Sequence, residues 1–235
     1  MARGSSIAYL RTLLETARAC APTIVEGRSG RLQRDTVDRR LRRWADNSVE
    51  AARARVNVHG LENFDSKQTF VVMSNHQSNY DILALYYAYP GSLRMVAKQE
   101  MRRLPLLGAA MEAAEFIFVD RRNNTAARAA LDVAKTKIKS GISIWIAPEG
   151  TRSKTGQLGE FKKGGFMLAL STETPILPCT VVGTRDVMPI KAATLYPSRT
   201  IDVTFHAPID VKDYGIERRD ELMERVRASI DSALP

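Results

Sequence analysis

A histidine and an aspartate stand five residues apart in the stretch SNHQSNYD, between two apolar runs of the chain. The run before His76 is typical of a buried strand, and the residues from Asp81 onward are typical of the first turn of a helix. A sharp turn between them can fold Asp81 back against His76. Its carboxylate can then hold one imidazole nitrogen and leave the other free to take a proton from a substrate hydroxyl. The spacing alone leaves a second interpretation open, in which Asp81 caps a helix and His76 is an ordinary polar turn residue.

A second polar group, Glu149-Gly150-Thr151-Arg152, follows the hydrophobic run ISIWIAP. Glycine lets the backbone approach a ligand closely, and the planar guanidinium of arginine suits a phosphate. Taken alone, the same residues could form a solvated loop whose charges have no special role.

Two further cations, Lys98 and Arg121, each lie directly after or at the end of a β-rich run. In open α/β sheets, reactive groups gather where strands end and helices begin. If these runs belong to one sheet, the two cations and Arg152 come to the edge that carries the histidine and the aspartate. Such an edge suits a substrate with both a phosphate and a reactive hydroxyl.

The predicted elements beyond residue 56 alternate between strands and helices. The β-rich runs are residues 56–59, 69–74, 93–97, 116–120, 142–147, 176–183 and 200–206. Helix-patterned segments are residues 81–89, 124–139, 162–171 and 217–233. This order predicts an α/β fold with a single mixed, partly parallel sheet of about seven strands flanked by helices.

The first quarter of the chain has a different pattern. An apolar stripe with helical spacing consists of Ile7, Leu10, Leu14, Ala17, Ala21 and Ile24. Pro22 is expected to end or bend this helix, and GRSG at residues 27–30 breaks the chain. A second amphipathic helix is expected from about Asp35, with Trp44 on its apolar side. We therefore expect an N-terminal two-helix amphipathic hairpin over residues 1–55, followed by an α/β domain over residues 56–235.

The net charge of +9 is concentrated in this hairpin. Residues 1–56 contain twelve of the 35 basic residues, all of them arginine, and six of the 26 acidic ones. Arg34, Arg39, Arg40, Arg42 and Arg43 crowd the second helix. Two interpretations remain open: the hairpin covers a core and shows water an arginine face, or it lies on an anionic membrane with Trp44 near the headgroups. Nucleic acid is disfavoured because the segment shows no recognition motif or stacking platform.

The chain shows no run of about eighteen apolar residues and no signal-peptide pattern. We therefore expect a peripheral or monotopic protein at the cytoplasmic face of a membrane. Two distant cysteines, Cys20 and Cys179, fit a reducing compartment or a fold that needs no disulfide.

Four ordered motifs between about residues 70 and 180 resemble those of the glycerolipid acyltransferase family, of the 1-acyl-sn-glycerol-3-phosphate (lysophosphatidic acid) acyltransferase type. Asn75-His76-Gln77-Ser78 with Asp81 is similar to the first motif, NHxxxxD, and Phe118-Val119-Asp120-Arg121 resembles the second. Pro148-Glu149-Gly150-Thr151-Arg152-Ser153, with FKKG downstream, matches the third, and Pro175-Ile176-Leu177-Pro178 resembles the fourth.

The resemblance implies direct acyl transfer. His76 takes the proton of the acceptor hydroxyl, Asp81 orients it, and the oxygen attacks an acyl thioester of coenzyme A or acyl carrier protein without a covalent acyl-enzyme. The implied product is phosphatidic acid, and no metal or cofactor is implied. The residues implied to bind the acceptor phosphate are Lys98, Arg121, Glu149, Gly150, Thr151 and Arg152.

Alternatives to this function remain at the level of the sequence. The acceptor could be another lysolipid or glycerol 3-phosphate, or the chain could be a non-catalytic membrane-surface protein. The chain also departs from the family in two ways. Glu115 stands where the second motif often begins with glycine, and the arginine-rich hairpin stands where many relatives carry a spanning helix.

Overall fold

The computed structural model describes residues 4–120 and 123–235. The strands are β1 (Arg55–His59), β2 (Val71–Ser74), β3 (Leu93–Lys98), β4 (Ile117–Val119), β5 (Ser143–Ile146), β6 (Ile176–Val182) and β7 (Thr200–Phe205). The α-helices are α1 (Ser6–Arg28), α2 (Arg34–Ala51), α3 (Tyr80–Ala88), α4 (Leu107–Ala113), α5 (Asn124–Lys139), α6 (Gly164–Thr172), α7 (Thr184–Val187) and α8 (Arg219–Asp231). Short 3₁₀ turns are η1 (Leu61–Asn63), η2 (Gln99–Arg103) and η3 (Val211–Asp213).

The seven strands form one mixed sheet in the order β1-β7-β6-β2-β5-β3-β4. Neighbouring strands are parallel except for β6 and β7, which are antiparallel. The predicted α/β class and mixed, partly parallel sheet are therefore confirmed. Because β6, β2, β5, β3 and β4 all run the same way, their carboxyl ends lie along one edge of the sheet.

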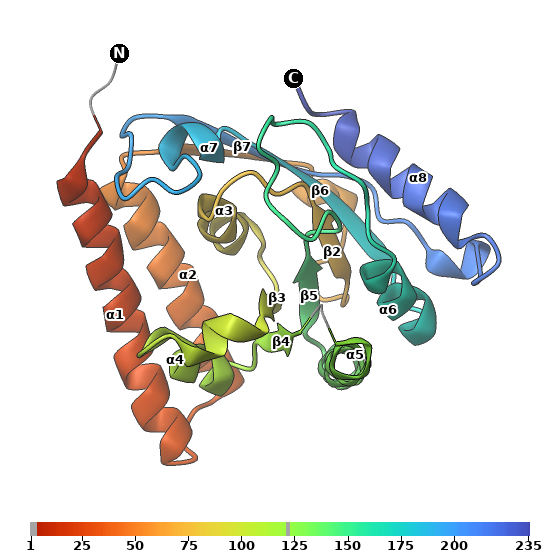
Figure 1. Cartoon of the computed structure of the whole chain (residues 1–235), viewed down its shortest axis with the longest axis horizontal. Helices are drawn as coiled ribbons and strands as arrows, with labels where there is room; N and C mark the ends of the chain where they lie inside the picture. Colours follow the sequence, from red (N-terminus) through yellow and green to blue (C-terminus); the bar gives the residue numbers. More distant parts are fainter. Residues whose placement is uncertain (1–3, 121–122) are drawn as a thin grey trace.

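Helices cover both faces of this sheet, so that its central strands are buried on both sides. Helices α1, α2 and α3 pack on one face, and α5, α6 and α8 pack on the other (Figure 1). All four residues of β2 are buried, as a strand covered on both faces requires. The carboxyl end of β2, the fourth of the seven strands, therefore lies between these layers at the middle of the sheet.

The N-terminal hairpin exists as predicted and packs against the α/β body. Ala45, Val49 and Ala52 of the α2 segment belong to the same buried cluster as α3 and the sheet. The expected break at GRSG is confirmed, since α1 ends at Arg28. The expectation that Pro22 would end the helix is wrong: α1 runs through Pro22 for six further residues to Arg28. Its packing against α2 and α4 outweighs the one backbone hydrogen bond that proline removes.

The two sides of α1 are reversed relative to an ordinary amphipathic helix. Its buried side carries small residues such as Ala8, Cys20 and Thr23, whereas several large apolar side chains face outward. The outward residues, between 47% and 70% exposed, are Ile7, Leu10, Leu13, Leu14 and Val25. Much of the predicted apolar stripe thus lies on the free face of α1.

The arginines of α2 do not form a single solvated face. Arg40 contacts Glu26 and Thr23 of α1, and Arg42 donates to the main-chain oxygens of Tyr87 and Tyr89. Trp44 does not extend to a headgroup position either. Its indole Nε1 donates to Thr16 Oγ1 at 3.0 Å, and its ring packs inward at 6.1 Å from that of Tyr86. Arg40, Arg42 and Trp44 of the second helix thus contact other parts of the protein.

Candidate active site

His76 and Asp81 form a direct pair at the carboxyl end of β2. His76 Nδ1 lies 2.7 Å from Asp81 Oδ2, and the same oxygen accepts the backbone N–H groups of Gln77 and Ser78 at 2.7 and 3.0 Å. Asp81 is fully buried in the first turn of α3. The turn 75–79 thus folds the carboxylate back onto the histidine, and the same carboxylate caps the turn. The interpretation in which Asp81 caps a helix is wrong, since the N-cap of α3 is Asn79 and the Asp81 carboxylate accepts from N–H groups that precede the helix.

The imidazole of His76 is held in one orientation by its neighbours. In the neutral imidazole, a contact between Nδ1 and a carboxylate is made by the Nδ1–H group, and Nε2 is then an acceptor. The ring lies edge-on to Trp145, with 5.5 Å between centroids and an interplanar angle of 88°. Only 17% of the side chain is exposed. The histidine is therefore held by contacts on two sides and lines the cavity described below.

The loop after β5 is bound to the histidine turn. Glu149 Oε1 accepts the backbone N–H of His76 at 3.1 Å, and its Oε2 accepts that of Gly159 at 2.8 Å. The N–H of Ser153 donates to the main-chain oxygen of His76 at 2.7 Å. Because both carboxylate oxygens of Glu149 are occupied by backbone groups, this buried side chain fixes the loop to the turn.

Four further residues implied by the motifs lie beside the histidine. Lys98, Gly150, Thr151 and Arg152 line the same cavity as His76. Arg121 lies outside the described residues. Strand ends thus bring at least two cations, Lys98 and Arg152, to the edge that carries the histidine.

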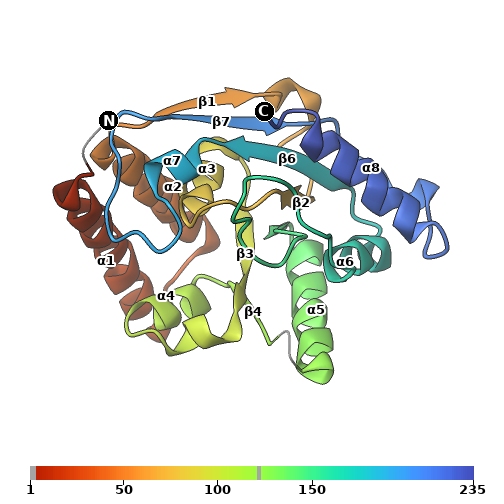
Figure 2. The same cartoon turned by 45° about the horizontal axis from the view of Figure 1, so that its top comes forward.

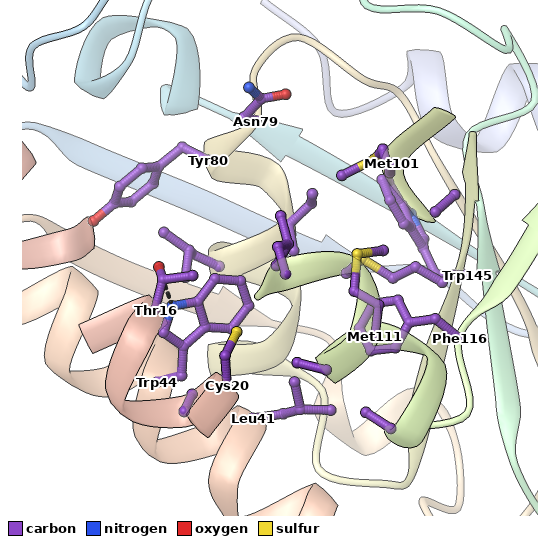
Figure 3. Close-up of a pocket in the computed structure, with 18 of the residues that line it drawn as sticks. Thr16, Cys20, Leu41, Trp44, Asn79, Tyr80, Met101, Met111, Phe116 and Trp145 are labelled. Atoms are coloured by element: carbon purple, nitrogen blue, oxygen red, sulfur yellow. Dashed lines mark hydrogen bonds between the residues drawn. The ribbon is translucent and has the colours of Figure 1, made fainter. Parts of the chain in front are cut away.

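A cavity of about 580 Å³ extends from this edge between α1, α2, α3 and α4. Its wall is mainly apolar and aromatic, as in a site for a hydrophobic ligand. Figure 3 shows Asn79 and Trp145 toward one side of the space and Leu41 and Cys20 toward the other. Lining side chains in that view are Thr16, Trp44, Tyr80, Met101, Met111 and Phe116. The hairpin therefore completes a cavity of which the α/β body supplies the end that carries His76.

Glu115, the departure in the second motif, faces away from this cavity. Its carboxylate contacts Lys137 at 2.6 Å and Arg34 at 3.3 Å. Burial alone would raise the pKa of Glu115, but hydrogen bonds from Lys137 and Arg34 hold it below its ordinary value. The backbone φ of Glu115 is +67°, a conformation that glycine adopts most easily. These contacts explain how a carboxylate can occupy a position that often carries glycine.

Thr184 is a site residue that sequence reasoning missed. Its hydroxyl, fully buried at the start of α7, donates to Asp81 Oδ1. Gly183 precedes it with φ +86°, at the end of β6. The signal was a polar residue directly after a parallel strand, but it becomes informative only once β6 is known to lie beside β2.

Among residues 4–120 and 123–235, no group of three or more His, Cys, Asp or Glu side chains could hold a metal ion. Within the same residues, no helix has the length and apolar character needed to cross a membrane.

Comparison with known proteins agrees with this geometry. The model of a family described as Acyltransferase matches residues 55–182. A human 1-acyl-sn-glycerol-3-phosphate acyltransferase alpha is 33% identical over 177 residues, which are 75% of this chain and 62% of the human one. A 1-acyl-sn-glycerol-3-phosphate acyltransferase of Borreliella burgdorferi is 32% identical over 183 residues, 78% of this chain and 73% of that relative. The chain thus spans about three fifths of the length of the human relative.

The same comparison in three dimensions extends to the hairpin. The crystal structure of the 1-acyl-sn-glycerophosphate (LPA) acyltransferase PlsC from Thermotoga maritima matches with a TM-score of 0.72 and 26% sequence identity. The match covers 96% of this chain and 97% of that one. The chain belongs to the acyltransferase family.

Proposed function

We propose that this protein moves a fatty acyl chain from a thioester donor to the free hydroxyl of 1-acyl-sn-glycerol 3-phosphate, giving phosphatidic acid. The observation that carries the proposal is the His76–Asp81 pair at one end of an apolar cavity that Lys98 and Arg152 also line. A base, cations for a phosphate and space for an acyl chain are the parts that this reaction needs. Relatives of this chain carry the name 1-acyl-sn-glycerol-3-phosphate acyltransferase, which supports this activity.

The chemistry follows from the tautomer of His76. Its Nε2 takes the proton of the acceptor hydroxyl as the hydroxyl oxygen attacks the thioester carbonyl carbon. The new C–O bond forms, the C–S bond breaks, and the departing thiolate takes the proton from Nε2. The buried carboxylate of Asp81 stabilises the imidazolium between these two transfers. No side chain becomes acylated.

The acceptor phosphate is assigned to Lys98 and Arg152, with Gly150 and Thr151 shaping the loop around it. Arg121 is assigned to the same group from the motif alone. Glu149 is assigned an indirect role in this pocket. Its two hydrogen bonds hold the loop that carries Gly150, Thr151 and Arg152. The cavity beyond His76 receives an acyl chain. The donor is acyl-coenzyme A or acyl-acyl carrier protein.

A panel of acceptors tests the substrate. Phosphatidic acid should form from lysophosphatidic acid with oleoyl-coenzyme A or oleoyl-acyl carrier protein as the donor. Thiol release from the same donors should be much slower with lysophosphatidylcholine or glycerol 3-phosphate as the acceptor. Arg152→Ala should raise the KM for lysophosphatidic acid about tenfold or more, because it removes a charge-assisted contact, and should leave the KM for the thioester unchanged. A preference for another acceptor would replace the substrate proposed here, and an effect confined to the thioester would move Arg152 to the donor site.

Thr184 is assigned as a positioning residue for Asp81. Thr184→Val should lower kcat by about tenfold to a hundredfold, because a hydrogen bond to a charged group contributes roughly 1.5–3 kcal/mol. The KM for either substrate should change little, and Thr184→Ser should restore kcat. Thr180→Val is the matched control, since Thr180 of β6 is also buried but its hydroxyl contacts Ile230 and His206 on the α8 side of the sheet. An equal loss of kcat in both variants would mean that Thr184 acts only through stability.

We also propose that residues 1–55 attach the α/β domain of residues 56–235 to the cytoplasmic face of a membrane, with an anionic surface as the partner. The outward leucines of α1 can enter the acyl region, and the exposed arginines of both helices can contact lipid phosphates. This placement brings the cavity, whose wall α1 helps to form, to the membrane that contains its lipid substrate.

Vesicle binding tests the attachment. Replacing Leu10 and Leu14 with serine should release the protein from vesicles of phosphatidylcholine and phosphatidylglycerol, and added salt should weaken the binding of the parent protein. The change is confined to exposed side chains, whereas removal of the whole hairpin would open the core. Ile216→Ser, at a residue 59% exposed near α8, is the control and should bind as the parent does. Full retention of the double variant in co-sedimentation would locate the membrane contact elsewhere.

A further inference from the structure

The connection between η2 and α4 exposes two leucines beside two arginines. Five consecutive residues, Arg102, Arg103, Leu104, Pro105 and Leu106, are exposed. Leu104 and Leu106 show 46% and 44% of their surface to solvent. Single exposed leucines are common on soluble proteins, but two on one short basic turn form a patch.

The turn of residues 102–106 is closed by backbone hydrogen bonds and a close backbone approach. The N–H of Leu104 donates to Met101 at 3.1 Å, and that of Gly108 donates to the main-chain oxygen of Leu104 at 2.9 Å. Gly108 lies so close to the turn that a Cβ there would be 2.1 Å from the main-chain oxygen of Arg102. Leu106 has a φ of +63°, which is costly for a residue with a side chain. The two leucines are therefore exposed on a turn whose backbone conformation is itself unfavourable at Leu106.

The position of the turn links it to the cavity. Met101 and Leu107, which flank the turn, both line the cavity, as does the half-exposed Leu13 of α1. Helix α4 packs beside α1, with Ala113 next to Gly27, and Figure 2 shows the two helices on the same side of the molecule. The exposed leucines of the turn and those of α1 thus lie on two elements that share the wall of one cavity.

The charges of the turn fit an anionic partner. Arg102 contacts Glu112 and lies over the ring of Phe118, 5.8 Å from its centroid, so that its side chain is held in place. Arg103 is exposed. Leucines flanked by arginines on this turn match the boundary between acyl chains and phosphates.

We propose that residues 102–106 are a second contact with the lipid bilayer, in which Leu104 and Leu106 enter the acyl region and Arg102 and Arg103 meet lipid phosphates. The inference rests on the membrane attachment proposed above and extends it from the hairpin to the α/β domain. With contacts on both α1 and this turn, the wall between α1 and α4 faces the bilayer. A lysolipid can then pass between membrane and cavity without crossing water.

Dye labelling of single introduced cysteines tests the second contact. Burial raises the pKa of the Cys20 and Cys179 thiols, so a thiol-reactive nitrobenzoxadiazole dye at neutral pH should label an exposed cysteine selectively. The three labelled variants are Leu104→Cys, Leu10→Cys on α1 as the positive control, and Leu61→Cys as the negative control. Leu61 matches the turn in exposure, at 44%, and follows β1 at the end of that strand away from α1 (Figure 2).

The vesicles are phosphatidylcholine with phosphatidylglycerol, with or without nitroxide groups on the acyl chains. The dye at residues 104 and 10 should shift its emission to the blue and be quenched by the nitroxides, whereas the dye at residue 61 should not respond. Leu104→Ser should also lower the partition coefficient by roughly tenfold, with Leu61→Ser unchanged.

Three outcomes would overturn the inference. A dye that enters the bilayer at residue 10 but stays in water at residue 104 would reject the second contact and retain the attachment through α1. Water exposure at both residues would reject the attachment as well. A blue shift at residue 104 that needs no vesicles and grows with protein concentration would assign the turn to contact between two copies of the chain.

Discussion

Replacing His76 with alanine is expected to lower kcat by about 10³-fold or more while the protein stays folded. The imidazole contacts the buried carboxylate of Asp81 and lines the cavity, and it supplies the proton acceptor of the proposed reaction. Its removal leaves Asp81 Oδ2 with the N–H groups of Gln77 and Ser78, so the carboxylate keeps hydrogen-bond partners. The measurement is kcat for phosphatidic acid formation, with circular dichroism as the check on folding.

Asp81→Asn separates orientation from charge. The amide can place its oxygen toward His76 and its nitrogen toward the Thr184 hydroxyl, which can rotate to accept. The ring would keep its orientation but lose the negative charge that stabilises the imidazolium, so kcat should fall by about 10²-fold.

Turnover in His76→Ala equal to that of the parent protein would remove the histidine from the mechanism.

Replacing Asp38 with alanine is expected to lower the free energy of unfolding by roughly 3 kcal/mol, because it removes the nearer of two carboxylates beside a buried charge and leaves Glu115 at 3.9 Å. Arg94 of β3 is fully buried and contacts Asp38 of α2 at 2.6 Å. Its guanidinium also donates to the main-chain oxygen of Ala114 at 2.6 Å. The pair therefore ties the hairpin to the sheet, and its loss should also loosen α2.

Urea unfolding of two further variants makes this prediction specific. Asp132→Ala removes an exposed carboxylate that pairs with Lys135 and should change the stability by less than about 1 kcal/mol. Asp38→Leu combined with Arg94→Met should recover much of the loss, because neither charge remains buried. A stability of Asp38→Ala within the range of the Asp132 control would show that Arg94 does not depend on its partner.

The histidine–aspartate pair could be predicted from the sequence because its geometry is local. Five residues separate the two side chains, and the turn between them is closed by the backbone N–H groups of Gln77 and Ser78. The alternation of strands and helices likewise predicted the class of the fold and the seven strands of the described residues. The helices α4 and α7 were not predicted, because four to seven residues carry too little periodicity.

Thr184 could not be assigned because its role depends on strand order. It lies 103 residues from Asp81 in the sequence and reaches it only because β6 pairs with β2. The same limit applies to the α2 arginines. Their helical pattern gives the side of the helix but not the partner, and the carbonyl groups at the end of α3 that receive Arg42 are known only from the packed structure.

Thiol release tests the central claim, acyl transfer through His76, most directly. Oleoyl-coenzyme A and oleoyl-acyl carrier protein are each incubated with the parent protein or His76→Ala, in the presence and absence of lysophosphatidic acid. The account predicts that thiol release from at least one donor requires both the acceptor and His76, with one phosphatidic acid formed per thiol released. Release at the same rate without the acceptor, or without the histidine, would contradict it.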